Sequence, residues 1–545
     1  MEERRLILAF ALSFAVLLGF RAWTNSRYPQ PAATQTQTPP AKPAESALPT
    51  LAAAPSVRPT ESQAAPGLAS APLVRGVEQR VEITTPRAEI ALTSKGARLL
   101  SWKLLDYKDQ RGKPVEMHPG GNPIPGPLDL VTGRADIDDL LRTAAYRWTH
   151  RGAGSGAAEI FEFSDGSLEV RKAIFPISRG GAFRIESEVK ENGLPIPVRI
   201  FWGPGLGQAT DEEKSLRGYL PPQIVEVDEG DTDVRVPPSA IESPRLGRAR
   251  LVAVENKYFA AILIGENRGI LDVVASTNRP GKDAEVQMAA SLPSVLIVGP
   301  KDYDDLAGLG LGAERIVPIG SWLGPIVVPL TRALRAVNAR VGNFGVAIIV
   351  LTLGIALALS PLRHYAILSS AKMAKVAPQI KAVQERYKRL SLTDPKRQQM
   401  QQEIAEVYEK NGIDMVKQTA SGCLPTLMTM PFLFAFYRML DISVDLKGAP
   451  FFWISDLSLK DPLFITPLLS GLSMIAMQRL MPAPAVDPAQ QRMMLMMPIV
   501  FSGLFAWAPA GLNLYWFVSN LAAMTQQALA MYFAPQLFPR PKAGS

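Results

Sequence analysis

The stretch FGVAIIVLTLGIALALSPL at residues 344–362 decides how the C-terminal part of this chain folds. It belongs to a run of 22 uncharged residues between Arg340 and Arg363 that contains few polar side chains. At about 1.5 Å per helical residue, such a run is long enough to cross a hydrocarbon layer of about 30 Å. We therefore predict a membrane-spanning helix at residues 341–362.

Three more uncharged runs follow toward the C-terminus. They contain 20, 17 and 47 residues between charged positions, and the longest can hold two helices around the turn APAG at 508–511. Segments of this length and polarity are typical of transmembrane helices. Together the runs predict four further spans, at about 420–440, 462–479, 493–508 and 512–533.

The N-terminal segment predicts a sixth span followed by a tether. Fifteen uncharged residues lie between Arg5 and Arg21, and the sequence RAWTNSRYP that follows lacks the small residues of a cleavage site. We predict an uncleaved signal-anchor helix at 1–23, with a cleaved signal peptide as the alternative. Ten prolines among Ala, Thr, Gln and Ser in 24–72 predict a flexible tether, because so little apolar surface cannot offset the entropy of ordering.

Residues 73–317 have a different pattern, in which apolar and polar residues alternate between Gly, Pro and Asp turns. This period of two predicts a large antiparallel β-sandwich domain. Residues 318–340 then place apolar side chains at helical spacing, with Arg332 and Arg335 on the opposite side. We predict an amphipathic helix in the lipid headgroup layer, and packing of this helix on the β domain is the alternative.

The charges of the loops predict the orientation. Residues 363–417 hold 11 Lys and Arg against 6 Asp and Glu, whereas residues 438–461 hold 3 against 4. The positive-inside rule therefore assigns 363–417, the N-terminus and the basic tail at 536–545 to the cytoplasm. Residues of about 24–340 are then expected outside, in the periplasm of a multi-pass inner membrane protein.

The loop at 363–417 is predicted to be a charged helical hairpin. The first helix is expected to be interrupted near Pro378, and the second to end at the Asn411-Gly412 pair. The hairpin is either a solvated connector or a basic surface that meets ribosomal RNA, anionic lipid or a nascent chain.

The composition excludes several kinds of chemistry. The single cysteine, Cys423, cannot form an intramolecular disulfide, and the three histidines lie far apart in the sequence. Metal-binding, nucleotide-binding and nucleophile motifs are not found in the sequence. We therefore predict no cofactor and no metal site. The net charge of +8 includes the excess in the 363–417 loop, so we do not expect a DNA partner.

Several strings resemble the YidC membrane-protein insertase family of Gram-negative bacteria, which is related to the mitochondrial and chloroplast oxidase-assembly insertases. The matching strings are NFGVAIIVLTL at 343–353, AKMAKVAPQIKAVQERY at 371–387, GCLPTLMTMPFLFAFYRML at 422–440, APFFWISDLSLKDP at 449–462 and AGLNLYWFVSNL at 510–521. The resemblance runs through essentially all of 343–533, and the outer domain matches by its order in the chain.

This resemblance implies a five-helix insertase core at 341–535. Such a core receives hydrophobic segments of nascent membrane proteins in a groove open to the cytosol and to lipid, alone or beside the Sec translocon. It uses neither bond chemistry nor ATP hydrolysis. The groove residues carried over by the resemblance are Thr352, Thr429, Tyr515, Trp516 and Asn520. Helix–helix hydrogen bonding is the alternative role for polar residues in spans.

One position departs from the family pattern. An alignment without gaps puts Ala356 where the family carries its groove arginine, four residues after Thr352. A mid-span arginine costs about 2.5–3.5 kcal/mol to insert and is retained only where it functions. Arg363 follows seven residues later, and we predict that it partly replaces the missing charge from the mouth of the groove. Thr429 stands where relatives often have Gln, so this groove is expected to be less polar.

The resemblance and the charge pattern also suggest partners. Hairpin residues expected to contact the ribosome, the signal-recognition pathway or anionic lipids are Lys372, Lys375, Lys381, Arg386, Lys388 and Arg389. Two other functions compete with insertion. A transporter or channel normally needs ionisable residues at membrane depth, which the later spans lack. A membrane-anchored periplasmic binding domain would instead give the activity to 73–317.

Overall fold

A computed structural model describes the chain from residue 72 onward, with gaps. The described ranges are 72–109, 112–121, 123–152, 157–177, 181–207, 219, 221–230, 232–279, 284–320, 322–387, 396–413, 430–480 and 488–533. The predicted signal anchor, the tether up to residue 71 and the basic tail therefore lie outside the described residues. The chain divides into two compact units, Met1–Gly67 with Val376–Met415 and Leu68–Lys375 with Val416–Ser545.

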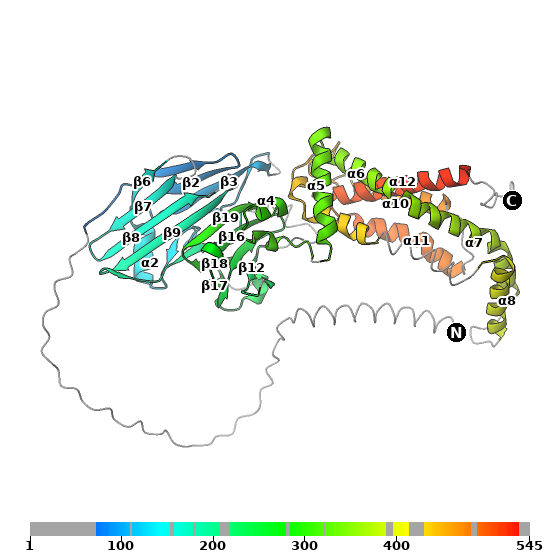
Figure 1. The fold of residues 1–545 in the computed structure, drawn as a ribbon, viewed down its shortest axis with the longest axis horizontal. Coiled ribbons are helices and arrows are strands. Elements are labelled where there is room, and N and C mark those ends of the chain that lie inside the picture. The colour runs from blue at the N-terminus through cyan, green and yellow to red at the C-terminus, as the bar shows by residue number, and fades with distance from the viewer. Residues whose placement is uncertain are drawn as a thin grey trace, which may run out of the picture. The chain divides into compact units, whose positions relative to one another are not determined.

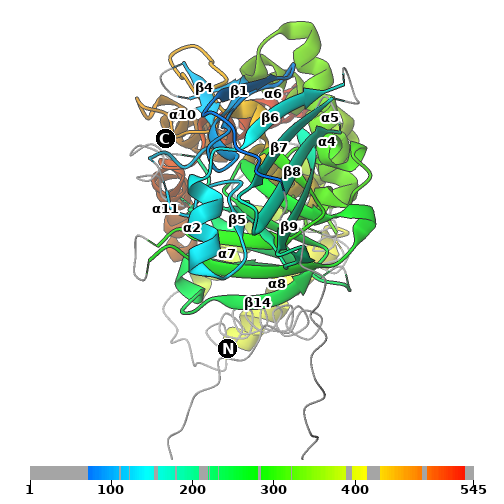
Figure 2. The same ribbon diagram turned by 90° about the vertical axis from the view of Figure 1, so that its left-hand side faces the viewer.

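Three antiparallel sheets contain the named strands of the larger unit (Figure 1; Figure 2). The first has the order β1-β2-β3-β4, which are Arg80–Thr84, Ala88–Thr93, Arg98–Lys108 and Pro114–Glu116. The second has the order β13-β12-β15-β16-β19-β9-β8-β7-β6, which are Asp233–Val236, Gln223–Val227, Leu251–Glu255, Phe259–Gly265, Ser294–Pro300, Ala182–Glu191, Leu168–Pro176, Ala158–Ser164 and Arg147–Arg151, with β10 (Leu194–Pro195) on β9. The third has the order β14-β17-β18-β11-β5, which are Arg245–Ala249, Leu271–Thr277, Val286–Ser291, Arg199–Trp202 and Leu130–Val131.

One aromatic side chain from each sheet meets in a common core. The Trp102 ring of β3 lies edge-on to Phe183 of β9, with 5.3 Å between ring centroids, and edge-on to Trp202 of β11 at 6.4 Å. All three side chains are fully buried, which stabilises the fold by about 1.5–3 kcal/mol each. The predicted antiparallel β-rich domain is therefore confirmed, because alternate apolar side chains of its strands face this core. The central strands β15, β16 and β19 are buried on both faces, and their other apolar side chains lie in a second cluster.

Short helical segments join the strands of the β-rich region. They are α2 (Ala135–Thr143), η2 (Pro238–Ala240), η3 (Glu266–Arg268), α4 (Tyr303–Gly308) and η4 (Ala313–Ile316). The N-cap residue of α4 is Asp302, whose side chain accepts a hydrogen bond from the backbone N–H of Asp305 at 2.9 Å. This cap satisfies one of the N–H groups that a helix start leaves without a partner.

Helices make up the described residues that follow. They are α5 (Gly324–Val341), α6 (Phe344–Ala358), α7 (Ser360–Arg386), α8 (Lys396–Lys410), a helix at 430–442, η5 (Val444–Leu446), α10 (Ile465–Leu480), α11 (Pro488–Phe505) and α12 (Ala510–Phe533). In the larger unit, α12 packs against α6 and α10, and α10 also packs against α11 (Figure 1). No single helix within the described ranges is both long enough and apolar enough to cross a bilayer, whereas the bent pair α6 and α7 meets this requirement jointly.

The predicted continuous span at 341–362 is broken near its C-terminal end. The side chain of Asn343 caps the start of α6 by accepting from the N–H of Val346 at 3.1 Å. The helix ends at Ala358, and α7 continues at an angle of 61°. Pro361 explains the break, because its ring nitrogen has no hydrogen to donate to the carbonyl one turn earlier and the ring clashes with that turn.

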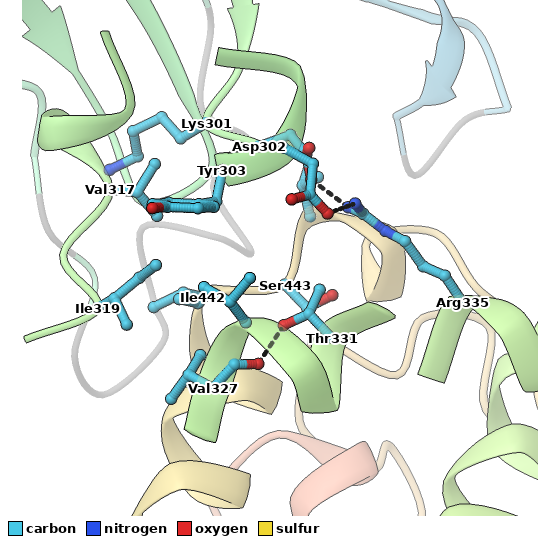
Figure 3. A pocket seen from close by; sticks show the side chains of 13 residues that line it. Lys301, Asp302, Tyr303, Val317, Ile319, Val327, Thr331, Arg335, Ile442 and Ser443 are labelled. Carbon is cyan, nitrogen blue, oxygen red and sulfur yellow. Dashed lines mark hydrogen bonds and ion pairs between the residues drawn. The ribbon is translucent and has the colours of Figure 1, made fainter. Parts of the chain in front are cut away.

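Both sides of α5 contact protein in the larger unit. Val327 and Leu334 on its apolar side are buried in a cluster shared with the β-rich region and the helices. On its polar side, Arg335 forms ion pairs with Asp302, before α4, and with Asp445 of η5, where Nε donates to Oδ2 at 2.8 Å. Figure 3 shows Arg335 and Asp302 beside a cavity of about 30 Å³ that α5 also lines. Packing of this helix on protein, the alternative raised from the sequence, thus accounts for its buried residues.

The smaller unit contains most of the predicted helical hairpin. α7 continues through Pro378, so the predicted interruption there is wrong. A proline removes one backbone hydrogen bond, and the buried Val376 and Ile380 on either side pack the helix in place. The predicted end of the second helix is confirmed, because α8 ends at Lys410 and Gly412 adopts a φ of 67°.

A buried lysine ties the first sheet to the second. Lys172 of β8 has an exposed fraction of 0%, and its Nζ donates to the backbone carbonyls of Ala97 and Leu128, both at 2.6 Å. Arg98 and Asp129, the residues that follow these carbonyls, pair with each other at 2.7 Å. Burial lowers the pKa of Lys172 to about 7. The neutral amine still has two N–H groups, one for each carbonyl.

We expect the Lys172→Met variant to unfold at a lower temperature than the wild type. Two buried carbonyls would lose their donor, at about 1–3 kcal/mol each. The folded-state pKa of about 7 lies below the ordinary lysine pKa of about 10.5, so the unfolded chain binds more protons between these values. Wild-type stability should therefore gain up to about 2–3 kcal/mol from Lys172 between pH 7 and 9, a gain that the variant lacks.

Thermal unfolding of the full chain in detergent at the two pH values measures both effects. The matched control is Lys190→Met on β9, where Nζ pairs with Glu188 at 2.8 Å in a partly exposed position. Equal pH profiles for the wild type and Lys172→Met would contradict the assignment.

Candidate functional site

The two predicted groove positions on α6 face neighbouring helices. Thr352 has an exposed fraction of 3%, and its Oγ1 donates to the backbone carbonyl of Ile348 at 2.6 Å. Ala356 is also buried, and its carbonyl accepts from Nε2 of Gln526 on α12 at 2.9 Å. Ala356 belongs to the last turn of α6, where carbonyls lack an intrahelical donor. Gln526 therefore supplies a hydrogen-bond donor to the last turn of α6.

Arg363 lies in the first turn of α7, beyond the break. Its side chain is half-buried, and its charge interacts with the hydroxyl of Tyr515 on α12. Its Nη1 atom is buried and has no hydrogen-bond partner among the described residues. A guanidinium group near Tyr515 is a cation inside the helical region rather than a fully exposed one.

The predicted aromatic residues pack against two different helices. The Tyr515 ring is stacked on Phe436 of the 430–442 helix with 4.2 Å between centroids, and its hydroxyl hydrogen-bonds Ser519. The Trp516 ring lies edge-on to Phe501 of α11 at 5.2 Å. These contacts hold both rings at the junction of α11, α12 and the 430–442 helix.

Asn520 belongs to a hydrogen-bonded seam between α10 and α12. Its Nδ2 donates to Oγ of Ser473 at 2.9 Å, and Asn520 has an exposed fraction of 9%. One turn earlier on α10, Oγ of Ser470 donates to the carbonyl of Asn513 of α12 at 2.9 Å. The seam matches the helix–helix alternative for this residue. The signal was present in the sequence, because Ser470 and Ser473 are three residues apart and Asn513 and Asn520 are seven apart, so each pair shares a helix face.

Some of the remaining predicted site residues are exposed on α7, and the others lie outside the described residues. Lys372, Lys375, Lys381 and Arg386 are exposed on α7. Arg386 pairs with Glu403 of α8 at 2.6 Å. Thr429, Lys388 and Arg389 lie outside the described residues. Across the part of the chain that the structure describes, His, Cys, Asp and Glu side chains do not gather into a group of three that could hold a metal ion.

Comparisons with known proteins find similarity to one group of membrane proteins. A family model described as "60Kd inner membrane protein" matches residues 336–536. The protein named membrane protein insertase YidC of Syntrophus aciditrophicus (strain SB) is 28% identical over 569 residues, which cover 96% of this chain and 98% of the relative. Its namesake in Vibrio cholerae is 29% identical over 565 residues, covering 97% and 98%. Along nearly its whole length, the chain is therefore similar to proteins named YidC membrane protein insertase.

A third relative matches about half of the chain, and two solved structures match most of its length at low identity. The YidC of Aeromonas hydrophila is 38% identical over 275 residues, about half of each chain. Among solved structures, "Active YidC insertase crystal structure with the first transmembrane domain resolved" covers 85% of this chain and 95% of its own, at 17% identity and a TM-score of 0.36. The YidC structure from Thermotoga maritima covers 84% and 98%, at 14% identity and a TM-score of 0.29.

We expect Asn520→Leu to lower the stability of this chain without lowering insertion per folded molecule. The substitution removes one buried interhelical hydrogen bond, worth about 0.6–2 kcal/mol in a membrane protein. Thermal unfolding in detergent measures the first effect, and insertion by reconstituted protein, normalised to the folded fraction, measures the second. Thr525→Val is the matched control, because that exposed hydroxyl bonds only the carbonyl of Leu521 in its own helix at 2.9 Å. A loss of insertion at unchanged stability would instead make Asn520 a substrate contact.

Proposed function

We propose that this chain inserts hydrophobic segments of newly made proteins into the inner membrane. The observation that carries the proposal is the similarity to YidC insertases along nearly the whole chain, at 96% and 97% coverage. The substrate class is a nascent membrane protein with an apolar segment and a polar flank. The reaction is a transfer between solvents, in which no covalent bond forms or breaks.

The physical difficulty in such a transfer is the polar flank of the substrate. Each backbone polar group that crosses hydrocarbon without a partner costs several kcal/mol. A groove that offers hydroxyl groups and a positive charge shortens the apolar path and accepts the flank temporarily. The apolar segment then moves into lipid, and burial at about 25 cal/mol per Å² of apolar surface drives the step without ATP.

The proposed topology has six spans. One is the N-terminal anchor, and the others include α6, the 430–442 helix, α10, α11 and α12. The proposal is supported by the uncharged lengths in the sequence and by the Lys and Arg excess in 363–417, which is expected to be cytoplasmic. The β-rich region is proposed to form a sandwich in the periplasm, with both chain ends in the cytoplasm.

We assign the groove to the faces of α6 and α12 that carry Thr352, Tyr515 and Trp516, together with Thr429. Arg363 supplies the positive charge that Ala356 lacks. The support for this assignment is the half-buried position of Arg363, its interaction with Tyr515 and its buried Nη1 atom, which lacks a hydrogen-bond partner within the described ranges. A buried cationic donor without a partner favours any rearrangement that brings an acceptor to it, and a carboxylate or carbonyl of the substrate is such an acceptor.

The hairpin of α7 and α8 is the proposed cytoplasmic contact surface. Its exposed cations support binding to anionic lipid, to the ribosome or to the signal-recognition pathway. The Sec translocon is a proposed partner for substrates with large translocated domains. The alternatives remain a transporter or a membrane-anchored binding domain. Deletion of most of 73–317 distinguishes insertion from the binding-domain alternative, because a membrane-anchored binding domain would then lose all activity.

We expect Arg363→Gln to slow insertion of a single-span substrate with an acidic flank, and to have little effect on the same substrate with a neutral flank. Two unit charges about 10 Å apart at an effective dielectric constant of about 20 attract by about 1.7 kcal/mol, so the loss should be about tenfold. Purified protein in liposomes and protease protection of the inserted substrate measure the rate.

A relocated charge provides the sharper test. Adding Ala356→Arg to Arg363→Gln should restore insertion of the acidic substrate, because it places a cation in the last turn of α6, seven residues before the lost charge. Arg340→Gln is the matched control, since Arg340 is exposed in the last turn of α5. Unchanged insertion of the acidic substrate by Arg363→Gln would contradict the role of Arg363, whereas failure of the wild type to insert either substrate would contradict the proposed function.

A further inference from the structure

Three helices begin beside one loop and form hydrogen bonds with it. Residues 449–461 connect the 430–442 region to α10. Within this loop, Asp461 accepts from the N–H of Thr466 in α10 at 2.7 Å, and the carbonyl of Leu457 accepts from the N–H of Gly511 in α12 at 2.9 Å. At α6, Nδ2 of Asn343 donates to the carbonyl of Pro450 at 3.0 Å. The loop therefore fixes the first turns of α6, α10 and α12 at one level.

An aromatic side chain locks this loop to α6. Phe451 is buried, and its ring lies directly over Gly345 in the first turn of α6. A Cβ atom at position 345 would lie 2.1 Å from Cδ2 of Phe451, so only glycine admits the ring. The backbone of the loop cannot move away from α6 without withdrawing this ring from its site.

The next two aromatic rings project away from the same turn. Phe452 has an exposed fraction of 84% and a φ of 50°, a left-handed conformation that is unusual for a bulky side chain. Its ring is stacked with Trp453 at 6.1 Å between centroids. Nε1 of Trp453 donates to Oδ1 of Asp461 at 3.0 Å, which holds the indole in place. Leu463 and Phe464 add further exposed apolar surface beside Asp461, with exposed fractions of 61% and 43%.

We propose that Phe452, Trp453, Leu463 and Phe464 form an anchor that enters the outer leaflet of the bilayer and is oriented by Asp461. The anchor residues carry no charge, and an indole with an apolar body and a satisfied N–H suits the boundary between headgroups and acyl chains. The anchor lies at the starts of the proposed spans, at the end opposite the basic hairpin in the chain's topology. The anchor thereby sets the depth at which α6, α10 and α12 begin. This proposal depends on the topology given under the proposed function.

A spin label at position 452 tests the anchor directly. Because Cys423 is the single cysteine, Cys423→Ser with Phe452→Cys gives one labelling site in the full chain. In liposomes of purified protein, we expect collisions with dissolved oxygen to exceed collisions with a water-soluble nickel chelate. The control is Cys423→Ser with Leu246→Cys, an 80% exposed position on β14 for which the opposite order is expected. A label at 452 that meets the nickel chelate as often as the label at 246 overturns the anchor.

Insertion measured in the same vesicles separates this outcome from failure of the proposed function. An aqueous label in vesicles that insert substrate overturns the anchor alone, whereas absence of insertion by the wild type counts against the function.

A second variant tests the orienting carboxylate. We expect Asp461→Asn to increase the mobility of the label at 452, and Asp456→Asn, a buried aspartate in the same loop, to leave it unchanged. Equal effects of the two substitutions overturn the role of Asp461.

Discussion

The backbone N–H groups at the starts of α6, α10 and α12 impose the constraint on which the helical region depends. A helix that begins inside or beside hydrocarbon must find acceptors for these groups, since water does not serve there. In the loop at 449–461, Asp461 and the carbonyl of Leu457 accept from α10 and α12. The start of α6 is capped by its own Asn343, whose Nδ2 donates to the carbonyl of Pro450 in the same loop. The three helices are consequently aligned before their side chains pack against each other, and the seam of Ser473 and Asn520 extends that alignment along α10 and α12.

The bend at Pro361 relates this alignment to the electrostatics of the proposed groove. A straight continuation of α6 would keep Arg363 on nearly the same face as Ala356, about 10 Å farther along the helix axis. The break of 61° instead gives Arg363 a different approach to α12, where its charge interacts with Tyr515. Nε2 of Gln526 on α12 donates to the carbonyl of Ala356 at 2.9 Å, so the last turn of α6 receives a neutral donor. The charge and the hydrogen-bond donor are thus carried by two different helices.

Much of this arrangement follows from one-dimensional patterns. Uncharged runs located the helices around 344, 465 and 510, and alternation located the β-rich region, because burial of one face leaves a period in the sequence. Pairings across the chain leave no such period. The contact of Lys172 with the carbonyls of Ala97 and Leu128 depends on sheets that are distant in sequence. The persistence of α7 through Pro378 likewise depends on packing of neighbouring residues, which local propensity does not include.

The early end of α6 has a consequence for the lipid around it. Its 15 residues extend about 22 Å, which is less than the roughly 30 Å hydrocarbon thickness of an ordinary bilayer. In the proposed topology, the loop at 449–461 holds the other end of the helix, so α6 alone would be shorter than the layer around it and the rest of the distance would fall to the bent α7. Neighbouring lipids would then shorten or tilt beside α6, at a fraction of a kcal/mol per Å. A thinner bilayer beside α6 would reduce the apolar distance that any polar flank has to travel.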